Sequence, residues 1–310
     1  MKITDNCGNA ITTGAAAVSF SNGDPPVPLL PDGSGSWQGT WVPTSGRHVL
    51  LFMGAVSGEG TAFGTATRSV QLDSSITRLP TVPSGAVVNA ASWAASVDRI
   101  APGSIIAIFG DQLAEETAVA ASPLPLTLGS AKVRIGKTAL PLFYVSPTQI
   151  NALIPPNIDL DPTASLVVEN SGFQSVALPV VSLATDPGIF SGGLVSAATW
   201  KVVSPVAPAQ RNDWIVIYCT GLGSVSESLN PTLPAPSDHL VYSKPVAVFI
   251  QGTSGQWISS YVGFAGLAPG YSGLYQVNAQ IPNDAATGDH VELYIQSAAR
   301  ESNHVFFSVR

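Results

Sequence analysis

The side chains that most often carry out catalysis are few in this sequence and widely separated. Four histidines occur in 310 residues, and none stands at zinc-ligand spacing from another histidine or a cysteine. The strings around Ser34 and Ser254 resemble plain turns and not the G-x-S-x-G motif of hydrolases. Acidic residues such as Glu169 and Glu292 lie in predicted strands without a supporting pattern, as solvated surface groups do. The sequence therefore predicts a non-enzymatic protein with no catalytic residues.

One turn near the N-terminus is rich in oxygen ligands. Asp5, Asn6 and Asn9 lie within five residues of one another, and carboxylate and amide oxygens are the ligands that calcium prefers. The same residues also form Asx turns, in which the side chain bonds nearby backbone without any metal. We favour the metal-free turn, so the sequence predicts no cofactor, and calcium at this turn stays as the alternative.

Two Gln-x-Asn pairs recur in the second part of the chain. Gln149 and Asn151 form one pair, and Gln276 and Asn278 form the other; in each, two residues separated by one position face the same side of a strand. A proline follows each pair and ends the strand. We predict a structural clamp in which these buried amides bond neighbouring loop backbone that would otherwise be unpaired.

The alternative function for these amides is to bind a sugar beside an aromatic ring. Tyr144 and Tyr275 are close in sequence to the two pairs, and Trp257 is a further candidate for stacking on a sugar. The chain has six tryptophans, spaced one or two per predicted module, and this spacing is typical of sandwich cores. The sequence therefore favours core positions for the tryptophans over a binding platform.

The elements that position these residues are predicted to be strands. Short apolar or alternating runs recur between clusters of turn residues, and Gly (29) and Pro (25) occur throughout. The predicted strands lie at 16–20, 48–56, 104–110, 131–136, 165–170, 213–219, 245–252, 290–297 and 304–310. The expected fold class is all-β, with immunoglobulin-like β-sandwiches in tandem.

Composition and charge restrict the partners. Only 11% of the residues are charged and the net charge is −7, with 13 Lys and Arg in the whole chain, which argues against nucleic acid because phosphate binding needs clustered cations. No apolar run approaches the ~20 residues of a membrane-spanning helix, so membrane insertion is not expected. Neutral surfaces self-associate readily. The expected partners are therefore other protein chains, including copies of this one, with a glycan as the alternative.

The two cysteines fall in different predicted modules. Cys7 is near the N-terminus and Cys219 is more than two hundred residues away, so a disulfide within one module is not expected. We predict that each acts as a small apolar packing residue.

Internal similarity indicates a duplicated module. The segment IAIFGDQL (106–113) matches IVIYCTGL (215–222) at an offset of 109, and SPTQINALIP (146–155) matches GLYQVNAQIP (273–282) at an offset of 127. The motifs have the same order in both halves. The predicted organisation is a first module at 1–73, a linker at 74–83, and two sandwich copies at 84–185 and 186–310.

The duplicated part also resembles a known family. The strings VVNAASW (87–93), APGSIIAIFGDQLA (101–114), DPGIF (186–190) and YVGFAGLAPGYSGLYQVNAQIP (261–282) look like an uncharacterised C-terminal domain family of large secreted acidobacterial proteins. The resemblance covers about residues 84–310 and implies export and a place at the end of a longer protein. It supplies no activity.

The first module resembles bacterial immunoglobulin-like repeats of the invasin and intimin kind. The resemblance consists of a D-x-x-G-N turn (5–9), a strand, a Gly-rich turn and a W-x-P segment (41–43). Such repeats carry one more strand before the first turn, where this chain has only residues 2–4. Three interpretations stay open: a fragment of a longer protein, a strand donated by another chain, or an unusual module.

Two functions are carried forward from these observations. The first is a non-catalytic structural or adhesive protein, secreted to the bacterial exterior or cell surface, that assembles by edge-strand pairing into a surface filament. The second is a carbohydrate-binding accessory module of a secreted multidomain protein, tested at Trp257 and Tyr275.

Overall fold

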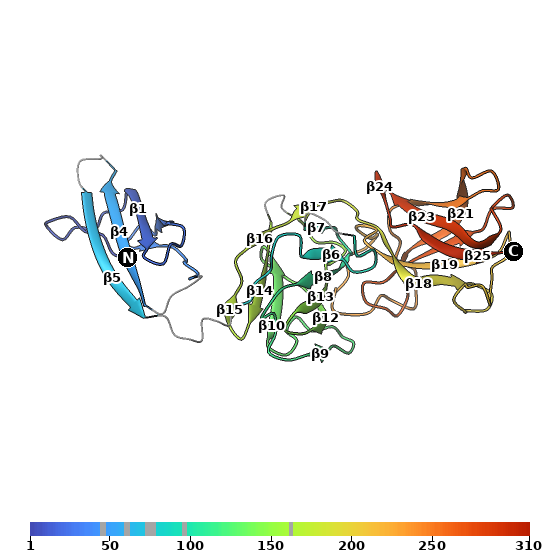
Figure 1. Cartoon of the computed structure of the whole chain (residues 1–310), viewed down its shortest axis with the longest axis horizontal. Coiled ribbons are helices and arrows are strands. Elements are labelled where there is room, and N and C mark those ends of the chain that lie inside the picture. The colour runs from blue at the N-terminus through green and yellow to red at the C-terminus, as the bar shows by residue number, and fades with distance from the viewer. Residues whose placement is uncertain (44–47, 59–62, 72–78, 95–97, 161–163) are drawn as a thin grey trace. The chain divides into compact units, whose positions relative to one another are not determined.

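β-Strands are the regular elements of this chain (Figure 1). The computed structural model describes residues 1–43, 48–58, 63–71, 79–94, 98–160 and 164–310. Within them each predicted strand overlaps an observed one, and the protein is all-β. No helix in that part of the chain is long and apolar enough to cross a membrane. The chain divides into two compact units, residues 1–78 and 79–310, and the linker predicted at 74–83 lies partly outside the described residues.

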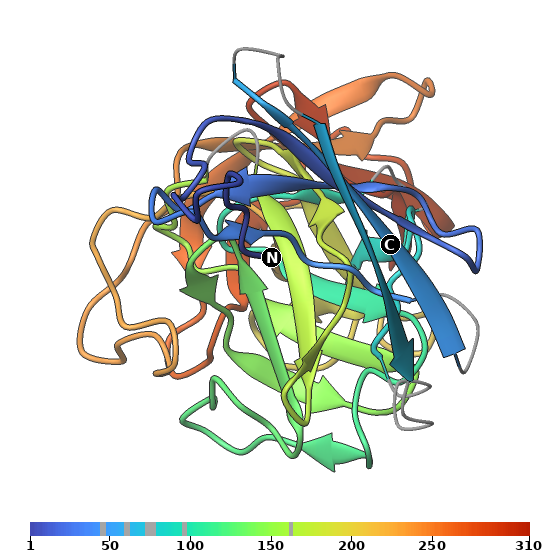
Figure 2. The ribbon, with the colours of Figure 1, turned by 90° about the vertical axis from the view of Figure 1, so that its left-hand side faces the viewer.

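The first unit contains five strands in the order β3-β2-β1-β4-β5. They are β1 (Gly14–Phe20), β2 (Val27–Pro31), β3 (Trp37–Gln38), β4 (His48–Ser57) and β5 (Phe63–Gln71). The alternation along GAAAVSF turns Ala16, Val18 and Phe20 into the core, where they meet Trp37 and Val49. Figure 2 shows β4 and β5 as two long blue strands, and their pairing leaves β5 at the edge of the sheet.

The first half of the second unit is a sandwich of two antiparallel sheets. One sheet has the order β6-β8-β13-β12-β9 and the other is built on β10 and β14, with a short parallel pair of β7 and β17 beside them. Ile106 and Ile108 of the first sheet and Val133 and Val168 of the second share one core. The strands are β6 (Val87–Asn89), β7 (Arg99–Ile100), β8 (Ile105–Phe109), β9 (Ala118–Val119), β10 (Ala131–Ile135), β11 (Thr138–Ala139), β12 (Leu142–Val145), β13 (Gln149–Leu153), β14 (Ser165–Asn170), β15 (Phe173–Gln174), β16 (Leu178–Pro179) and β17 (Val181–Ser182).

The second half wraps one continuous ladder around its own core. The ladder runs β18-β19-β22-β21-β20-β23-β24, with β25 also on β23. Strand β21 is long enough to pair with β20 at its start and with β22 at its end, so it joins the two layers. The strands are β18 (Gly188–Ser196), β19 (Trp214–Thr220), β20 (Val246–Gln251), β21 (Trp257–Leu267), β22 (Tyr275–Gln280), β23 (Gly288–Ser297), β24 (Arg300–Glu301) and β25 (Val305–Val309).

The segments that match in sequence pair with one another in the same register in both halves. Gln149 on β13 lies opposite Phe109 on β8, and Gln276 on β22 lies opposite Tyr218 on β19. These are the positions that the offsets of 109 and 127 relate to each other. The two halves therefore use equivalent residues for equivalent strand pairs.

Candidate functional site

Two histidines on the surface, His239 and His304, take part in ion pairs. His239 lies between two carboxylates, with Nε2 2.8 Å from Glu227 and Nδ1 2.8 Å from Asp238. These hydrogen bonds, that to Glu227 first, raise the pKa of His239 above its ordinary value. His304 has its Nδ1 2.7 Å from Glu292. Among the described residues no group of three or more His, Cys, Asp or Glu side chains could hold a metal ion.

The turn proposed for calcium uses its carboxylate to bond its own backbone. Asp5 Oδ1 accepts the amides of Cys7 and Asn9 at 2.8 Å each, and Oδ2 accepts the side-chain amide of Asn9 at 2.9 Å. These bonds, led by the Asn9 side chain, lower the pKa of Asp5. Asn6, the third candidate, lines a neighbouring cavity. The geometry is that of the Asx turn that the sequence favoured.

The two cysteines have different environments. Cys219 is fully buried in the core of the second half, as predicted, and burial raises the pKa of its thiol. Cys7 is exposed in the Asp5 turn, so the prediction that it packs as an apolar residue is wrong. In this turn Asp5 bonds the backbone and the Asn9 side chain, and the Cys7 side chain stays exposed to solvent instead of packing into a core.

Each Gln-x-Asn pair bonds within itself. Gln149 Nε2 donates to Asn151 Oδ1 at 2.8 Å, and Gln276 Nε2 donates to Asn278 Oδ1 at the same distance. The four side chains are half-buried, so the expectation of fully buried amides is corrected. The bonds that the structure shows run between the paired amides and not to loop backbone, because residues two apart on a strand lie side by side on one face.

The three aromatic candidates for sugar binding do not meet in one site. Tyr275 is fully buried and its hydroxyl donates to the carbonyl of Gly223; burial raises the pKa of this phenol. Tyr144 is half-buried opposite Asn151. Trp257 begins β21, ten residues from the position that faces Tyr275, a separation of roughly 33 Å along the strand. Tyr275 therefore cannot contact a sugar at the surface, because it points into the core while Gln276 and Asn278 lie on the outer face.

The tryptophans depart from the core positions that their spacing suggested. Trp37 is buried, at 2% exposure, whereas four of the others are between 37% and 66% exposed. These four are Trp93, Trp200, Trp214 and Trp257. Three of them contact other rings: Trp93 lies beside Phe109, Trp214 beside Tyr261, and Trp257 over a larger cluster. Sequence spacing does not show which face of a strand a tryptophan takes, so the prediction was wrong for these four.

The larger cluster is a column of rings on the outer face of β20, β21 and β23 and of the residue that directly precedes β25. Tyr294 stacks on Phe249 at 5.0 Å between ring centroids and on His304 at 4.7 Å. β20 and β25 flank β23 on opposite sides, so these two rings cover the two faces of Tyr294. Trp257 stands perpendicular to both Tyr294 and His304, at 4.8 and 5.4 Å. We call these four rings the aromatic column.

The two halves of the second unit are joined by buried polar contacts. The hydroxyl of Thr220 accepts the amide of Ile105 at 2.8 Å and donates to the carbonyl of Gly103 at 3.1 Å. Asn89 donates to the carbonyl of Asp186 at 2.7 Å. Thr220 has no exposed surface and Asn89 has 4%, so water does not compete for these bonds.

Two arginines from different halves reach the same carboxylate. Arg99 and Arg300 place Nε 3.9 and 3.4 Å from Asp186, at the junction of the halves. The Asp186 side chain is 13% exposed, which reduces solvent screening of the pairs. These ionic contacts and the buried hydrogen bonds hold residues 79–310 as one unit.

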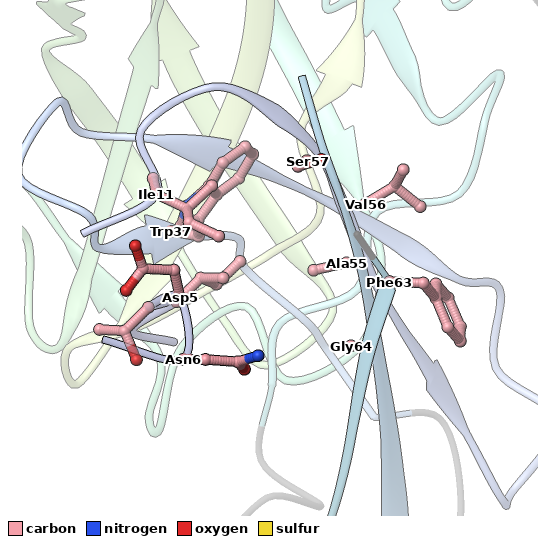
Figure 3. A pocket seen from close by; sticks show the side chains of 11 residues that line it. Asp5, Asn6, Ile11, Trp37, Ala55, Val56, Ser57, Phe63 and Gly64 are labelled. Atoms are coloured by element: carbon pink, nitrogen blue, oxygen red, sulfur yellow. The ribbon is translucent and has the colours of Figure 1, made fainter. Parts of the chain in front are cut away.

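In the first unit a cavity lies between the N-terminal segment and the strands β4 and β5. Its volume is about 220 Å³. Figure 3 shows Trp37 and Asp5 on one side of it, with Ala55 of β4 facing them and Phe63 of β5 pointing away. β5 is exposed on nearly all of its nine residues, and its pairing partner among the described residues is β4 alone. No described strand pairs with the other edge of β5, which we call its free edge.

Comparison with known proteins gives no family. No family model matches the chain, and no curated protein matches it. Similar solved structures include the surface-layer protein SbsC, domains 4–9 (11% identity, TM-score 0.23, 99% of this chain and 41% of that chain), and a gamma-CGTase from Bacillus clarkii (11%, 0.25, 94% and 40%). A plexin A4 extracellular region is also similar (8%, 0.26, 96% and 30%). This chain spans less than half the length of each, and TM-scores this low assign it neither a fold nor a function.

Proposed function

We propose that the chain is a non-catalytic structural module of the bacterial exterior that joins other copies of itself through β5. The free edge of β5 is the observation that carries this proposal. An extracellular place is supported by the resemblance of residues 84–310 to C-terminal domains of secreted proteins. A structural role is supported by the way residues 79–310 are locked into one body.

The proposed duplication within the second unit also supports a structural role. Equivalent residues form equivalent strand pairs in both halves, as the register at Gln149 and Gln276 shows. A repeated sandwich joined rigidly to its copy lengthens a module without adding a joint, which suits a spacer.

The edge of β5 lacks the features that protect most edge strands. Its sequence, FGTATRSVQ, contains no proline and a single charged residue, Arg68, and its register against β4 runs without a bulge. Such an edge presents a row of N–H and C=O groups that another strand can pair with. Phe63 at one end is 72% exposed and gains cover when a strand is added.

A second copy of β5 is a suitable strand for this edge. In an antiparallel pair centred on Thr67, Thr65 of one copy faces Ser69 of the other, and Arg68 faces Ala66, so like charges do not meet. A two-fold arrangement of this kind uses the same patch on both copies and closes at a dimer.

Charge substitutions at the facing positions test the proposal. In Thr65→Lys/Ser69→Lys, lysines would face each other twice across the dimer, and at ~1 kcal/mol for each like-charge pair the dimer weakens roughly thirtyfold. In Thr65→Lys/Ser69→Glu, each lysine would face a glutamate, and association should return. Sedimentation equilibrium of the full chain, with reductant because Cys7 is exposed, measures the dimer constants.

The matched control is Thr12→Lys, an exposed threonine outside β5. It should leave the dimer constant unchanged. A wild-type protein that stays monomeric at millimolar concentration, or a Lys/Lys variant that dimerises as well as wild type, would show that β5 does not join copies.

A further inference from the structure

Trp257 presents one face of its indole to solvent and packs the other against Tyr294 and His304, two other rings of the aromatic column. Both faces of Tyr294 are taken by Phe249 and His304, so the perpendicular Trp257 meets the ring edges of Tyr294 and His304 with its own face. Tyr294 is 7% exposed beneath it, while Trp257 keeps 40% of its surface exposed. The exposed indole face is therefore held in place before any ligand arrives.

We propose that this face of Trp257 is a binding platform for a neutral, β-linked glucan. A β-glucose ring has equatorial hydroxyls, which leave flat faces of C–H groups. These slightly positive hydrogens lie well against the negative face of an indole. A platform that is already ordered binds without the entropy loss of fixing a side chain. This inference does not depend on self-association through β5, which lies in the other unit.

Polar groups beside the column suit the hydroxyls at the sugar rim. Glu292 bonds Nδ1 of His304, and the His304 side chain is 37% exposed. Its other ring nitrogen, Nε2, can therefore bond a sugar hydroxyl. Glu301 lies opposite Gln296 in the ladder of β23 and β24. Carboxylates accept hydrogen bonds from sugar hydroxyls and repel acidic polysaccharides, and for this reason we commit to a neutral glycan.

The packing of the rings favours a sugar over a quaternary ammonium ion as the ligand. Such cations bind inside cages whose aromatic walls surround them. Here the rings fill the space between one another, with centroid distances of 4.7–5.0 Å along the stack, and leave a flat outer face. A flat face fits the side of a sugar ring better than a compact cation.

A second exposed ring extends the platform along β25. Phe306 is 61% exposed and lies two residues from His304, about 7 Å further along the strand, opposite Glu292. A chain of several sugars could contact both rings, whereas a disaccharide would contact Trp257 alone. Affinity should therefore increase with glucan length.

Calorimetric titration of the full chain with cellobiose and cellohexaose tests the proposal. Wild type should bind cellohexaose more tightly than cellobiose. Trp257→Ala should weaken both by about tenfold or more, and Trp257→Phe, which keeps a ring, should stay within about threefold of wild type. Phe306→Ala should weaken cellohexaose and leave cellobiose unchanged.

The matched control is Trp200→Ala, which removes a 66% exposed indole outside the column and should leave binding unchanged. Circular dichroism establishes that each variant is folded, and Phe306→Ala with cellohexaose keeps the test falsifiable if Trp257→Ala does not fold. The proposal is overturned if cellohexaose does not bind, if only oligogalacturonate or phosphocholine binds, if Trp257→Ala binds as wild type does, or if Phe306→Ala binds cellohexaose as wild type does.

Discussion

Replacing Thr220 with valine should separate the stabilities of the two halves of residues 79–310. Valine has nearly the shape of threonine, so Thr220→Val removes the hydroxyl and little else. The hydroxyl is the shared partner of the Ile105 amide and the Gly103 carbonyl, both on the other half. Thr220→Ser keeps the hydroxyl and loses one methyl group, and it is the matched control.

The expected loss follows from the burial of the site. Thr220 is fully buried, so the Ile105 amide and the Gly103 carbonyl cannot turn to water when the hydroxyl is gone. Leaving a buried polar group unpaired costs about 1–3 kcal/mol, so two such groups give about 2–4 kcal/mol after partial relaxation. Loss of one methyl group in Thr220→Ser costs about 1 kcal/mol. Valine should therefore be the more damaging substitution.

Urea unfolding of the full chain gives the free-energy differences, and hydrogen exchange of peptides that contain Ile105 locates them. We expect Thr220→Val to accelerate exchange in the first half, although the substitution lies in the second. Equal stability of the Val and Ser variants, or normal exchange at Ile105 in Thr220→Val, would refute the view that this hydroxyl couples the halves.

Three further predictions follow from single sites. Gly103→Ala should lower the free energy of unfolding in urea by about 2–4 kcal/mol, because φ of Gly103 is +75° and an added Cβ would lie 2.0 Å from the buried hydroxyl of Tyr275. Wild-type stability of this variant would contradict that packing. A thiol reagent should modify Cys7 in the native protein and Cys219 only after unfolding, as thiol counting by mass spectrometry would show. In an NMR titration Glu227→Gln should lower the raised pKa of His239 toward 6.5; the pair's contribution to stability is complete below that pH and is lost as pH rises through the raised value, and an unchanged pKa would exclude the carboxylate as its cause.

The sequence predicted the strands better than the faces that their side chains take. The offsets of 109 and 127 relate Phe109 to Tyr218 and Gln149 to Gln276, and in the structure Phe109 lies opposite Gln149 just as Tyr218 lies opposite Gln276. The alternation of side chains along a strand also predicts the orientation of Tyr275. Because Gln276 and Asn278 lie on the outer face, Tyr275, which directly precedes Gln276, must point inward. The sugar-binding interpretation of Tyr275 overlooked this parity.

The aromatic column could not be predicted from sequence. Its four rings come from residues 249, 257, 294 and 304, which form no short motif and are separated by several turns and strands. Only the registers of β20 with β21, of β20 with β23 and of β23 with β25 bring them to one face. The same holds for Thr220 and Ile105, which are 115 residues apart and meet across the junction of the halves.

The two halves of the proposed duplication differ at the residues that join them. The second half has 18 more residues between its motifs (127 − 109), and this longer segment contacts the first half: Val225 donates to Asn157 Oδ1 at 3.2 Å, and Leu124 donates to the carbonyl of Thr232 at 2.7 Å. The Asn157 side chain also donates to a carbonyl of that segment. At the offset of 127 Asn157 corresponds to Asp284, whose carboxylate can accept but not donate. A further copy docked on the second half in the same way would therefore lose the bond that the Asn157 side chain donates, so this contact belongs to the junction between the two halves.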